Sequence, residues 1–255
     1  MTPPPRPGGW QTEIAEVLEG KRRWAVICAD NREVLPAIPA VDATLTDPPY
    51  TSATHKGARS SHNDYRSIPI DFAPITDLWF VPALLNLTRR WVVAFCELEM
   101  LADYRRAAGD AYVRGGFWHK PDAMPQITGD RPGQPGEGVA VMHRAGKKRW
   151  NGGGYPAFWS YGIERADRCH PTQKNLDHFI KLVQQFSDPD EVIFDPFCGS
   201  GTTGAAAIRC GRRFIGVERD PNYAATAAAR LAAESQGISY SAAKAGQIAL
   251  FGALK

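Results

Sequence analysis

The chain has 255 residues, of which 44% are apolar and 22% charged, and its net charge is +3. This length can bury a full core, and the composition is that of an ordinary soluble globular protein. Because the net charge is small, any contact with nucleic acid has to come from local basic patches. The absence of an apolar run of about 18 residues and of an N-terminal signal pattern argues against export and membrane insertion.

Helical and strand patterns alternate along the chain after an N-terminal extension of residues 1–20, which starts with a proline-rich, disorder-prone stretch. Helices are predicted over residues 12–19, 75–87 and 97–108, and strands over residues 24–27, 43–46 and 91–95. Such alternation predicts an α/β fold with a mostly parallel sheet and helices on both faces. Ligands of such sheets bind beyond the carboxyl ends of the strands.

The segment Thr46-Asp47-Pro48-Pro49-Tyr50 ends one of these strands. An exocyclic amino group on a base is a poor nucleophile, because its lone pair is delocalised into the ring. The Asp47 carboxylate and the Pro48 carbonyl can each accept one of its N–H groups, and Tyr50 can stack on the ring. Asp-Pro-Pro also forms turns for purely geometric reasons, so a stiff strand-ending turn is the alternative.

A second motif lies about 150 residues further on, where an apolar strand ends at Asp195 and leads into a glycine turn. Gly199, Gly201 and Gly204 match the pattern G-x-G-x-x-G, and an alanine-rich helix follows them. Glu218 closes the next strand, at the spacing of a ribose-binding acid. An oxidoreductase that binds a dinucleotide is therefore a competing interpretation.

The position of Asp195 argues against that competitor. A carboxylate just before the glycine turn would repel a pyrophosphate but could pair with the ammonium of an amino-acid moiety. S-adenosylmethionine carries that ammonium and has no phosphate. Glu218 would accept ribose hydroxyls from either ligand and does not separate them.

The two motifs, in this order, resemble the permuted (β-class) DNA amino-methyltransferases of the N6-adenine/N4-cytosine type. His170-Pro171-Thr172-Gln173-Lys174 resembles a third family segment, although Asn175 stands where proline is frequent. The resemblance covers most of residues 24–232, and the segments around Trp118 and Gly129 resemble short forms carried by phages and prophages. It implies a Rossmann-like class I methyltransferase fold with a mostly parallel seven-stranded sheet, and a catalytic domain over residues 21–235.

The resemblance also implies roles for individual residues. The catalytic residues would be Asp47, Pro48, Pro49 and Tyr50. The residues around S-adenosylmethionine would be Asp30, Thr46, Asp47, His170, Thr172, Gln173, Lys174, Asp195, Phe197, Gly199, Ser200, Gly201, Thr202, Thr203, Glu218 and Arg219. For two of these an alternative stands, because Asp30 could instead cap the turn at Asn31 and Lys174 could be a solvated charge.

The expected reaction is methylation of a flipped base in double-stranded DNA, as in restriction–modification systems. Adenine N6 is the preferred target, since an aspartate at the head of the first motif accompanies adenine more often than cytosine in this family. Cytosine N4 is the alternative. Methylation of cytosine carbon 5 would need a cysteine nucleophile after proline, and no Pro-Cys step exists; Cys198 is interpreted as a packing residue.

Two regions interrupt the alternation of strands and helices, residues 51–71 and residues 115–162. The second is rich in glycine, proline and tryptophan and is the candidate target-recognition insertion. Its tryptophans, Trp118, Trp150 and Trp159, are assigned to packing. The residues predicted to contact DNA are Lys56, Arg59, Arg144, Lys147, Lys148 and Arg149, with ordinary solvated loops as the alternative.

The tail, residues 236–255, contains a segment resembling the peptide that docks on bacterial sliding clamps. Gln247, Leu250 and Phe251 would be its contact residues, unless they fold back on the domain. The six histidines show no metal-ligand spacing, so no metal is predicted. Five cysteines without a C-x-x-C pair indicate reduced thiols and a cytoplasmic location in a bacterial or phage-infected cell. A catalytically silent nucleic-acid-binding relative remains a third function class.

Overall fold

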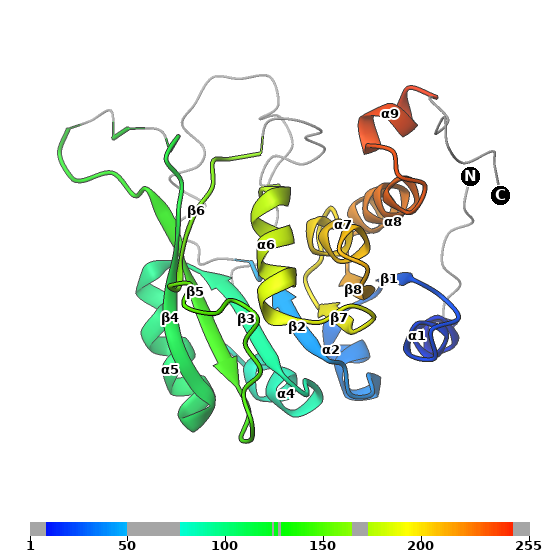
Figure 1. The fold of residues 1–255 in the computed structure, drawn as a ribbon, viewed down its shortest axis with the longest axis horizontal. Helices are drawn as coiled ribbons and strands as arrows, with labels where there is room; N and C mark the ends of the chain where they lie inside the picture. The colour runs from blue at the N-terminus through cyan, green and yellow to red at the C-terminus, as the bar shows by residue number, and fades with distance from the viewer. Residues whose placement is uncertain (1–8, 50–76, 124, 127–128, 165–172, 247–255) are drawn as a thin grey trace.

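One sheet organises the chain in the computed structural model, which describes residues 9–49, 77–123, 125–126, 129–164 and 173–246. Its strand order is β1-β8-β7-β2-β3-β5-β4-β6 (Figure 1). The strands are β1 (Trp24–Cys28), β2 (Ala43–Thr46), β3 (Trp91–Cys96), β4 (Tyr112–His119), β5 (Gly136–His143), β6 (Phe158–Ser160), β7 (Val192–Asp195) and β8 (Arg213–Glu218). Eight strands are thus present in these residues instead of the seven expected, because the short β6 adds to the free edge of β4.

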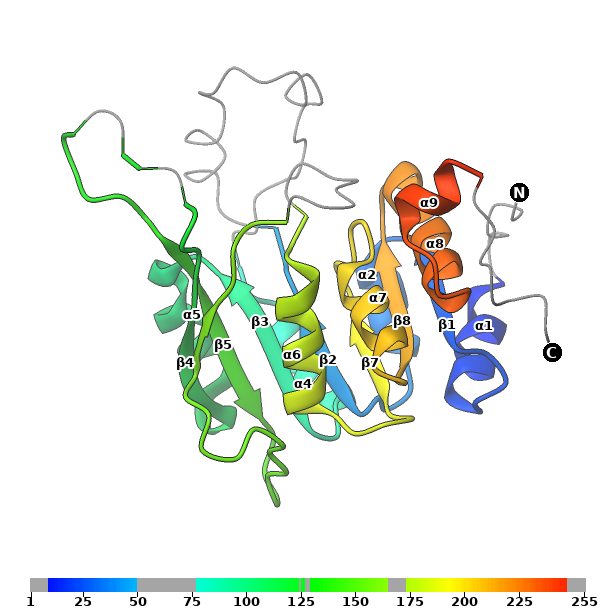
Figure 2. The same cartoon turned by 45° about the horizontal axis from the view of Figure 1, so that its top comes forward.

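Strand direction divides the sheet into two parts. The strands β1, β8, β7, β2 and β3 are mutually parallel, so their carboxyl ends lie along one edge. The strand β5 runs antiparallel to both β3 and β4, and its arrow points the opposite way in Figure 2. The predicted mostly parallel α/β fold is therefore confirmed.

Helices cover both faces of the sheet (Figures 1 and 2). One face carries α1 (Trp10–Leu18), α2 (Asn31–Val34), α4 (Phe80–Leu87) and α5 (Leu101–Ala108), and the other carries α6 (Leu176–Phe186), α7 (Thr202–Arg209) and α8 (Pro221–Ser235). A short helix α9 (Tyr240–Lys244) follows α8. None of the helices in the described residues is long and apolar enough to cross a membrane.

The central strands are mostly apolar because both faces of the sheet are buried. In β3, Val92 and Ala94 pack into the core under α4 and α5, whereas Val93 and Phe95 pack into the core under α6. Alternate side chains of a strand point to opposite faces, so one apolar run serves two cores. The predicted strands over residues 24–27, 43–46 and 91–95 correspond to β1, β2 and β3 of the parallel part of the sheet.

Residues 115–162 differ from the predicted insertion, since three strands of the main sheet, β4, β5 and β6, occupy much of this region. Glycine is needed here because large rings lie against the backbone: a Cβ on Gly116 would be 2.7 Å from the Trp159 ring. Trp118 and Trp159 are almost completely buried, which confirms their predicted packing role. The end of β4 at His119 and the start of β5 at Gly136 lie at the edge of the sheet where β3 ends.

Candidate active site

The carboxyl edge of the parallel strands collects four of the predicted carboxylates. Asp30 follows β1, Asp47 follows β2, Asp195 ends β7 and Glu218 ends β8. The strands β2 and β7 are direct neighbours, and Thr44 is paired with Phe194. The expectation that the Asp47 and Asp195 segments meet on one side of the sheet is therefore confirmed.

Asp195 joins the two segments chemically. Its carboxylate accepts hydrogen bonds from the Thr46 hydroxyl at 2.7 Å, the Thr203 hydroxyl at 2.5 Å and the Phe197 backbone N–H at 3.1 Å. The side chain is buried, and this burial raises the pKa of the Asp195 carboxyl to about 7, although the three donors oppose the shift. Asp195 thus fixes Thr46, the residue that immediately precedes Asp47.

The backbone of the glycine turn between β7 and α7 packs closely against α8. Gly199 and Gly201 have φ angles of +51° and +79°, in the left-handed region that favours glycine. A Cβ on Gly201 would be 2.9 Å from the Leu231 side chain of α8. The turn therefore lies directly over α8, and α7 starts beside the end of β7.

Glu218 ties this turn to the neighbouring strand. Its carboxylate accepts the Gly199 N–H at 2.9 Å and the Asp220 N–H at 2.9 Å. Burial raises the pKa of Glu218, while these two backbone donors lower it. Each carboxylate oxygen has more than one lone pair, so Glu218 can accept further donors at this edge.

Asp47 is held by Lys174, which in turn belongs to a group with two residues that the sequence did not indicate, Glu137 and Lys120. The Lys174 ammonium lies 3.1 Å from the Asp47 carboxylate and 2.5 Å from that of Glu137, which also pairs with Lys120. Burial opposes ionisation of Glu137, but the two lysines outweigh it and lower its pKa to about 2. Burial likewise lowers the pKa of Lys174, yet Asp47 and Glu137 raise it above its ordinary value. Lys174 is therefore not a solvated charge.

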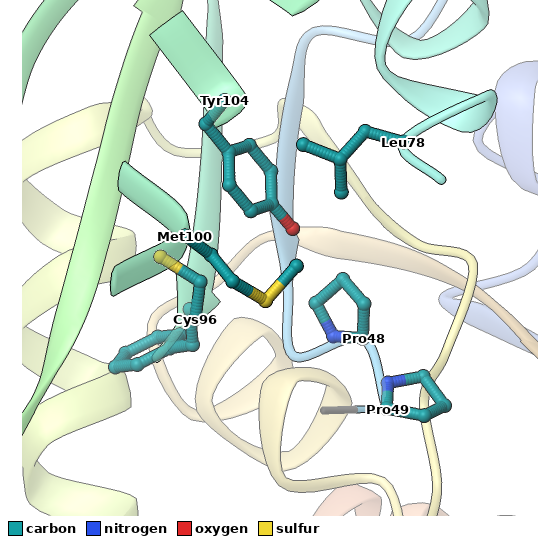
Figure 3. A pocket seen from close by; sticks show the side chains of 7 residues that line it. Pro48, Pro49, Leu78, Cys96, Met100 and Tyr104 are labelled. Atoms are coloured by element: carbon teal, nitrogen blue, oxygen red, sulfur yellow. The ribbon is translucent and has the colours of Figure 1, made fainter. Parts of the chain in front are cut away.

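A small recess lies against the two prolines of the first motif. It is lined by Pro48, Pro49, Leu78, Phe95, Cys96, Met100 and Tyr104. Figure 3 shows the Tyr104 ring with its hydroxyl end directed toward Pro48. Tyr104 is almost completely buried, and burial raises its pKa well above the ordinary value. The backbone next to Asp47 is thus supported from α5 and β3 by mostly apolar side chains.

Three other residues predicted to lie around the cofactor make contacts with residues of the protein itself. Asp30 caps α2 by accepting the Arg32 N–H at 2.8 Å, as its alternative interpretation required. Phe197 packs edge-on against Phe80 with ring centroids 5.1 Å apart. The Thr202 hydroxyl accepts a hydrogen bond at 2.9 Å from the guanidinium of Arg230, a buried residue of α8.

Of the remaining predicted residues that the structure describes, Gln173 and Ser200 are buried, whereas Arg219 is exposed. Residues that lie outside the described part of the chain are Tyr50, Lys56, Arg59, His170, Thr172, Gln247, Leu250 and Phe251, and their roles stay predictions.

The basic cluster of residues 144–149 does not lie at the carboxyl edge. It follows β5, whose last residue His143 pairs with Trp91, the first residue of β3. Six residues of β3 separate the cluster from the candidate site, which is roughly 20 Å at the usual rise of a strand. Arg144 donates to the Asn86 carbonyl at 3.1 Å, and Arg149 pairs with Asp188 at 2.8 Å. The structure thus does not bring Arg144, Lys147, Lys148 and Arg149 together with Asp47, and their contact with DNA stays a prediction.

The doubly wound sheet, with its glycine turn at the edge, has the architecture of class I S-adenosylmethionine-dependent methyltransferases. The chain belongs to the DNA methylase family of N6 and N4 amino-methyltransferases, whose model matches residues 73–229. It is 24% identical over 243 residues to the type II methyltransferase M.HinfI of Haemophilus influenzae, a match that covers 81% of this chain and 67% of that protein. The putative methylase YubD of Escherichia coli (strain K12) is 38% identical over 85 residues, covering 33% of this chain and 36% of YubD.

Solved structures agree with this assignment. The complex of M1.HpyAVI with SAM superposes with a TM-score of 0.62 at 26% identity, over 82% of this chain and all of that one. The cytosine-N4-specific PvuII DNA methyltransferase has the same fold, with a TM-score of 0.62 at 16% identity over 81% of this chain and 86% of that one. No group of three or more histidine, cysteine, aspartate or glutamate side chains in the described ranges could hold a metal ion.

Proposed function

We propose that the chain transfers a methyl group from S-adenosylmethionine to the exocyclic amino group of a base in double-stranded DNA, and that the target is adenine N6. The observation that carries the proposal is the hydrogen bond from Thr46 to Asp195. This bond joins the Asp-Pro-Pro segment to the glycine-turn segment, which supports a site in which one holds an amino group and the other an amino-acid moiety. M1.HpyAVI, solved with SAM, supports the choice of cofactor.

The residues at the edge fit this cofactor. Asp195 offers a buried carboxylate to an ammonium, and Glu218 offers acceptors to the ribose hydroxyls at the end of the neighbouring strand. Gly199 and Gly201, both in the left-handed region, carry no side chain that would hold a ligand away from the backbone of the turn. When bound, the cofactor supplies an electrophilic methyl group on a sulfonium centre.

The residues of this chain would act by positioning the target. Asp47 and the Pro48 carbonyl accept the two N–H groups of the base, which turns the nitrogen lone pair out of the ring plane and toward the methyl group. Holding both partners in this geometry supplies much of the acceleration, since the donor is already activated. Swinging the base out of the duplex costs about a few kcal/mol of stacking and pairing free energy.

Adenine is preferred to cytosine because Asp47 stands at the head of the Asp-Pro-Pro segment, a combination more often associated with adenine in the family. Cytosine N4 is the second candidate, and the shared fold of the cytosine-N4-specific PvuII enzyme supports keeping it. A pyridine-nucleotide oxidoreductase has less support, because the Asp195 carboxylate would face its pyrophosphate.

The test is to incubate the protein with unmethylated duplex DNA and labelled S-adenosylmethionine, and then to identify the modified nucleoside by chromatography. N6-methyladenine is expected, and Asp47→Ala should reduce its formation to background. Asp103→Ala is the matched control, since Asp103 is a half-exposed carboxylate on α5 that pairs with Arg106. N4-methylcytosine would overturn the base assignment, and no transfer to any of a varied set of DNAs would overturn the proposal.

A further inference from the structure

Four charged side chains from four separate segments form one continuous chain of ion pairs, Lys120–Glu137–Lys174–Asp47. Lys120 follows β4, Glu137 belongs to β5, Lys174 precedes α6 and Asp47 follows β2. The exposed fractions of the side chains are 21%, 13%, 11% and 28% in that order. The signs alternate, so the four charges sum to zero.

Burial makes this balance necessary. Both ammonium groups lie over the Trp118 ring, Lys120 at 4.5 Å and Lys174 at 5.3 Å from its centroid, and the ring excludes water from their side. Buried charges are tolerated when they are paired, and removing one partner leaves an uncompensated charge. Loss of Glu137 would remove the carboxylate that both ammonium groups share.

We propose that Glu137, supported by Lys120, is a positioning residue that acts on Asp47 through Lys174. The inference rests on the proposed function, in which Asp47 accepts an N–H of the target base. An amino nitrogen that forms a bond to carbon gains positive charge before it releases a proton to solvent, so a negative charge on Asp47 favours the reaction. Lys174 alone would cancel that charge, but Glu137 shares the ammonium at 2.5 Å and leaves Asp47 able to accept.

Glu137→Gln keeps the size of the side chain and removes its charge. We expect its kcat to fall about 10- to 30-fold, the effect of one uncompensated charge several ångströms from the reacting nitrogen in a medium of intermediate dielectric. The Kd for S-adenosylmethionine should change less than kcat, because the carboxylates proposed to hold the cofactor, Asp195 and Glu218, end β7 and β8, whereas Glu137 lies in β5. Glu234→Gln is the matched control: Glu234 is a buried carboxylate paired with Arg209 at the last turn of α7, and its loss should lower stability without lowering kcat.

A double variant separates positioning from a general structural role. Glu137→Gln/Lys174→Gln also removes the Lys174 ammonium from beside Asp47, so its kcat should exceed that of Glu137→Gln alone. If the two losses multiply as independent effects, or if Glu137→Gln keeps the kcat of the unaltered protein, the inference is wrong.

A second measurement does not depend on activity. Titration of the Lys174 ammonium by NMR should show an elevated pKa in the unaltered protein and a lower one in Glu137→Gln. An unchanged Lys174 titration would refute the inference even in an active enzyme. A clear shift in a protein that methylates no DNA would support the linkage while refuting the proposed function.

Discussion

Under the proposed function, binding of S-adenosylmethionine should weaken as the pH falls through about 7. Burial raises the pKa of Asp195 to about 7, and its ionised form is the one that pairs with an ammonium. At lower pH the protein must release this proton before the ligand binds, so the affinity decreases on the acid side. The factor 1 + 10^(7 − pH) gives a Kd about tenfold higher at pH 6 than at pH 8, or about 1.4 kcal/mol.

Isothermal titration calorimetry at pH 6, 7 and 8 would measure this dependence, and two buffers of different ionisation enthalpy would give the number of protons released. Asp195→Asn is the perturbation: it should bind more weakly at pH 8 and lose the slope, because its amide does not titrate. Burial also raises the pKa of Glu218, so Glu218→Gln in the same series would show whether that carboxyl adds to the slope. A constant Kd for the unaltered protein between pH 6 and 8, or a slope that survives in Asp195→Asn, would refute the reasoning.

Two further predictions concern stability. His178 is fully buried among aromatic rings, and burial, reinforced by Lys174, lowers its pKa to about 3, below the ordinary 6.5. The unfolded chain therefore takes up the proton first, and the free energy of unfolding should fall as the pH drops below 6.5, by about 2 kcal/mol at pH 5. Urea denaturation at pH 5 and 7 should show that His178→Phe removes this loss, and an equal loss in both proteins would contradict the burial argument. Gly204→Ala should cost about 1–3 kcal/mol, because its Cβ would lie 2.7 Å from the Phe214 ring. Gly154→Ala, with open space at that position, should be nearly neutral in the same assay, and equal effects of the two changes would argue against close packing of α7 on β8.

The sequence was sufficient to predict the part of the fold that carries the two motifs. Apolar runs ending at Asp47 and Asp195 identify buried parallel strands, and such strands end at one edge whatever their order. The contact between Thr46 and Asp195 follows from β2 and β7 being neighbours in the sheet.

The outer strands β5, β4 and β6 were less predictable, because contacts between residues distant in the sequence determine their place in the sheet. Gly116 suggests a loop in isolation, but it lies in β4 because the Trp159 ring, 43 residues later in the chain, occupies the space of its side chain. The basic residues 144–149 were recognised correctly as a cluster, but no local pattern gives the direction of the strand before them. Since β5 is antiparallel, it carries the cluster to the opposite edge from Asp47.

The ion pairs of Asp47 depend even more on the folded state. Glu137 resembles an ordinary polar residue at the start of a strand, and Lys174 an ordinary charge before a helix. Their pairing joins residues 37 positions apart, on segments brought together only when β5 and α6 pack. A search for a carboxylate flanked by glycines at the start of an apolar strand could have marked Glu137 as unusual, but it could not have named its partners.

Asp195 and Asp47 differ in the groups that offset their negative charge, and this difference matches the roles proposed for them. Among the described residues, Asp195 is contacted by two hydroxyls and one backbone N–H, all of them uncharged, so its negative charge is available to a cationic group. Asp47 already has the Lys174 ammonium at 3.1 Å, and a second cation would gain less there. A neutral amino group needs only a hydrogen-bond acceptor, and Asp47 provides one at lower electrostatic cost. These electrostatics support the proposal that the charged ligand binds at β7 and the neutral one at β2.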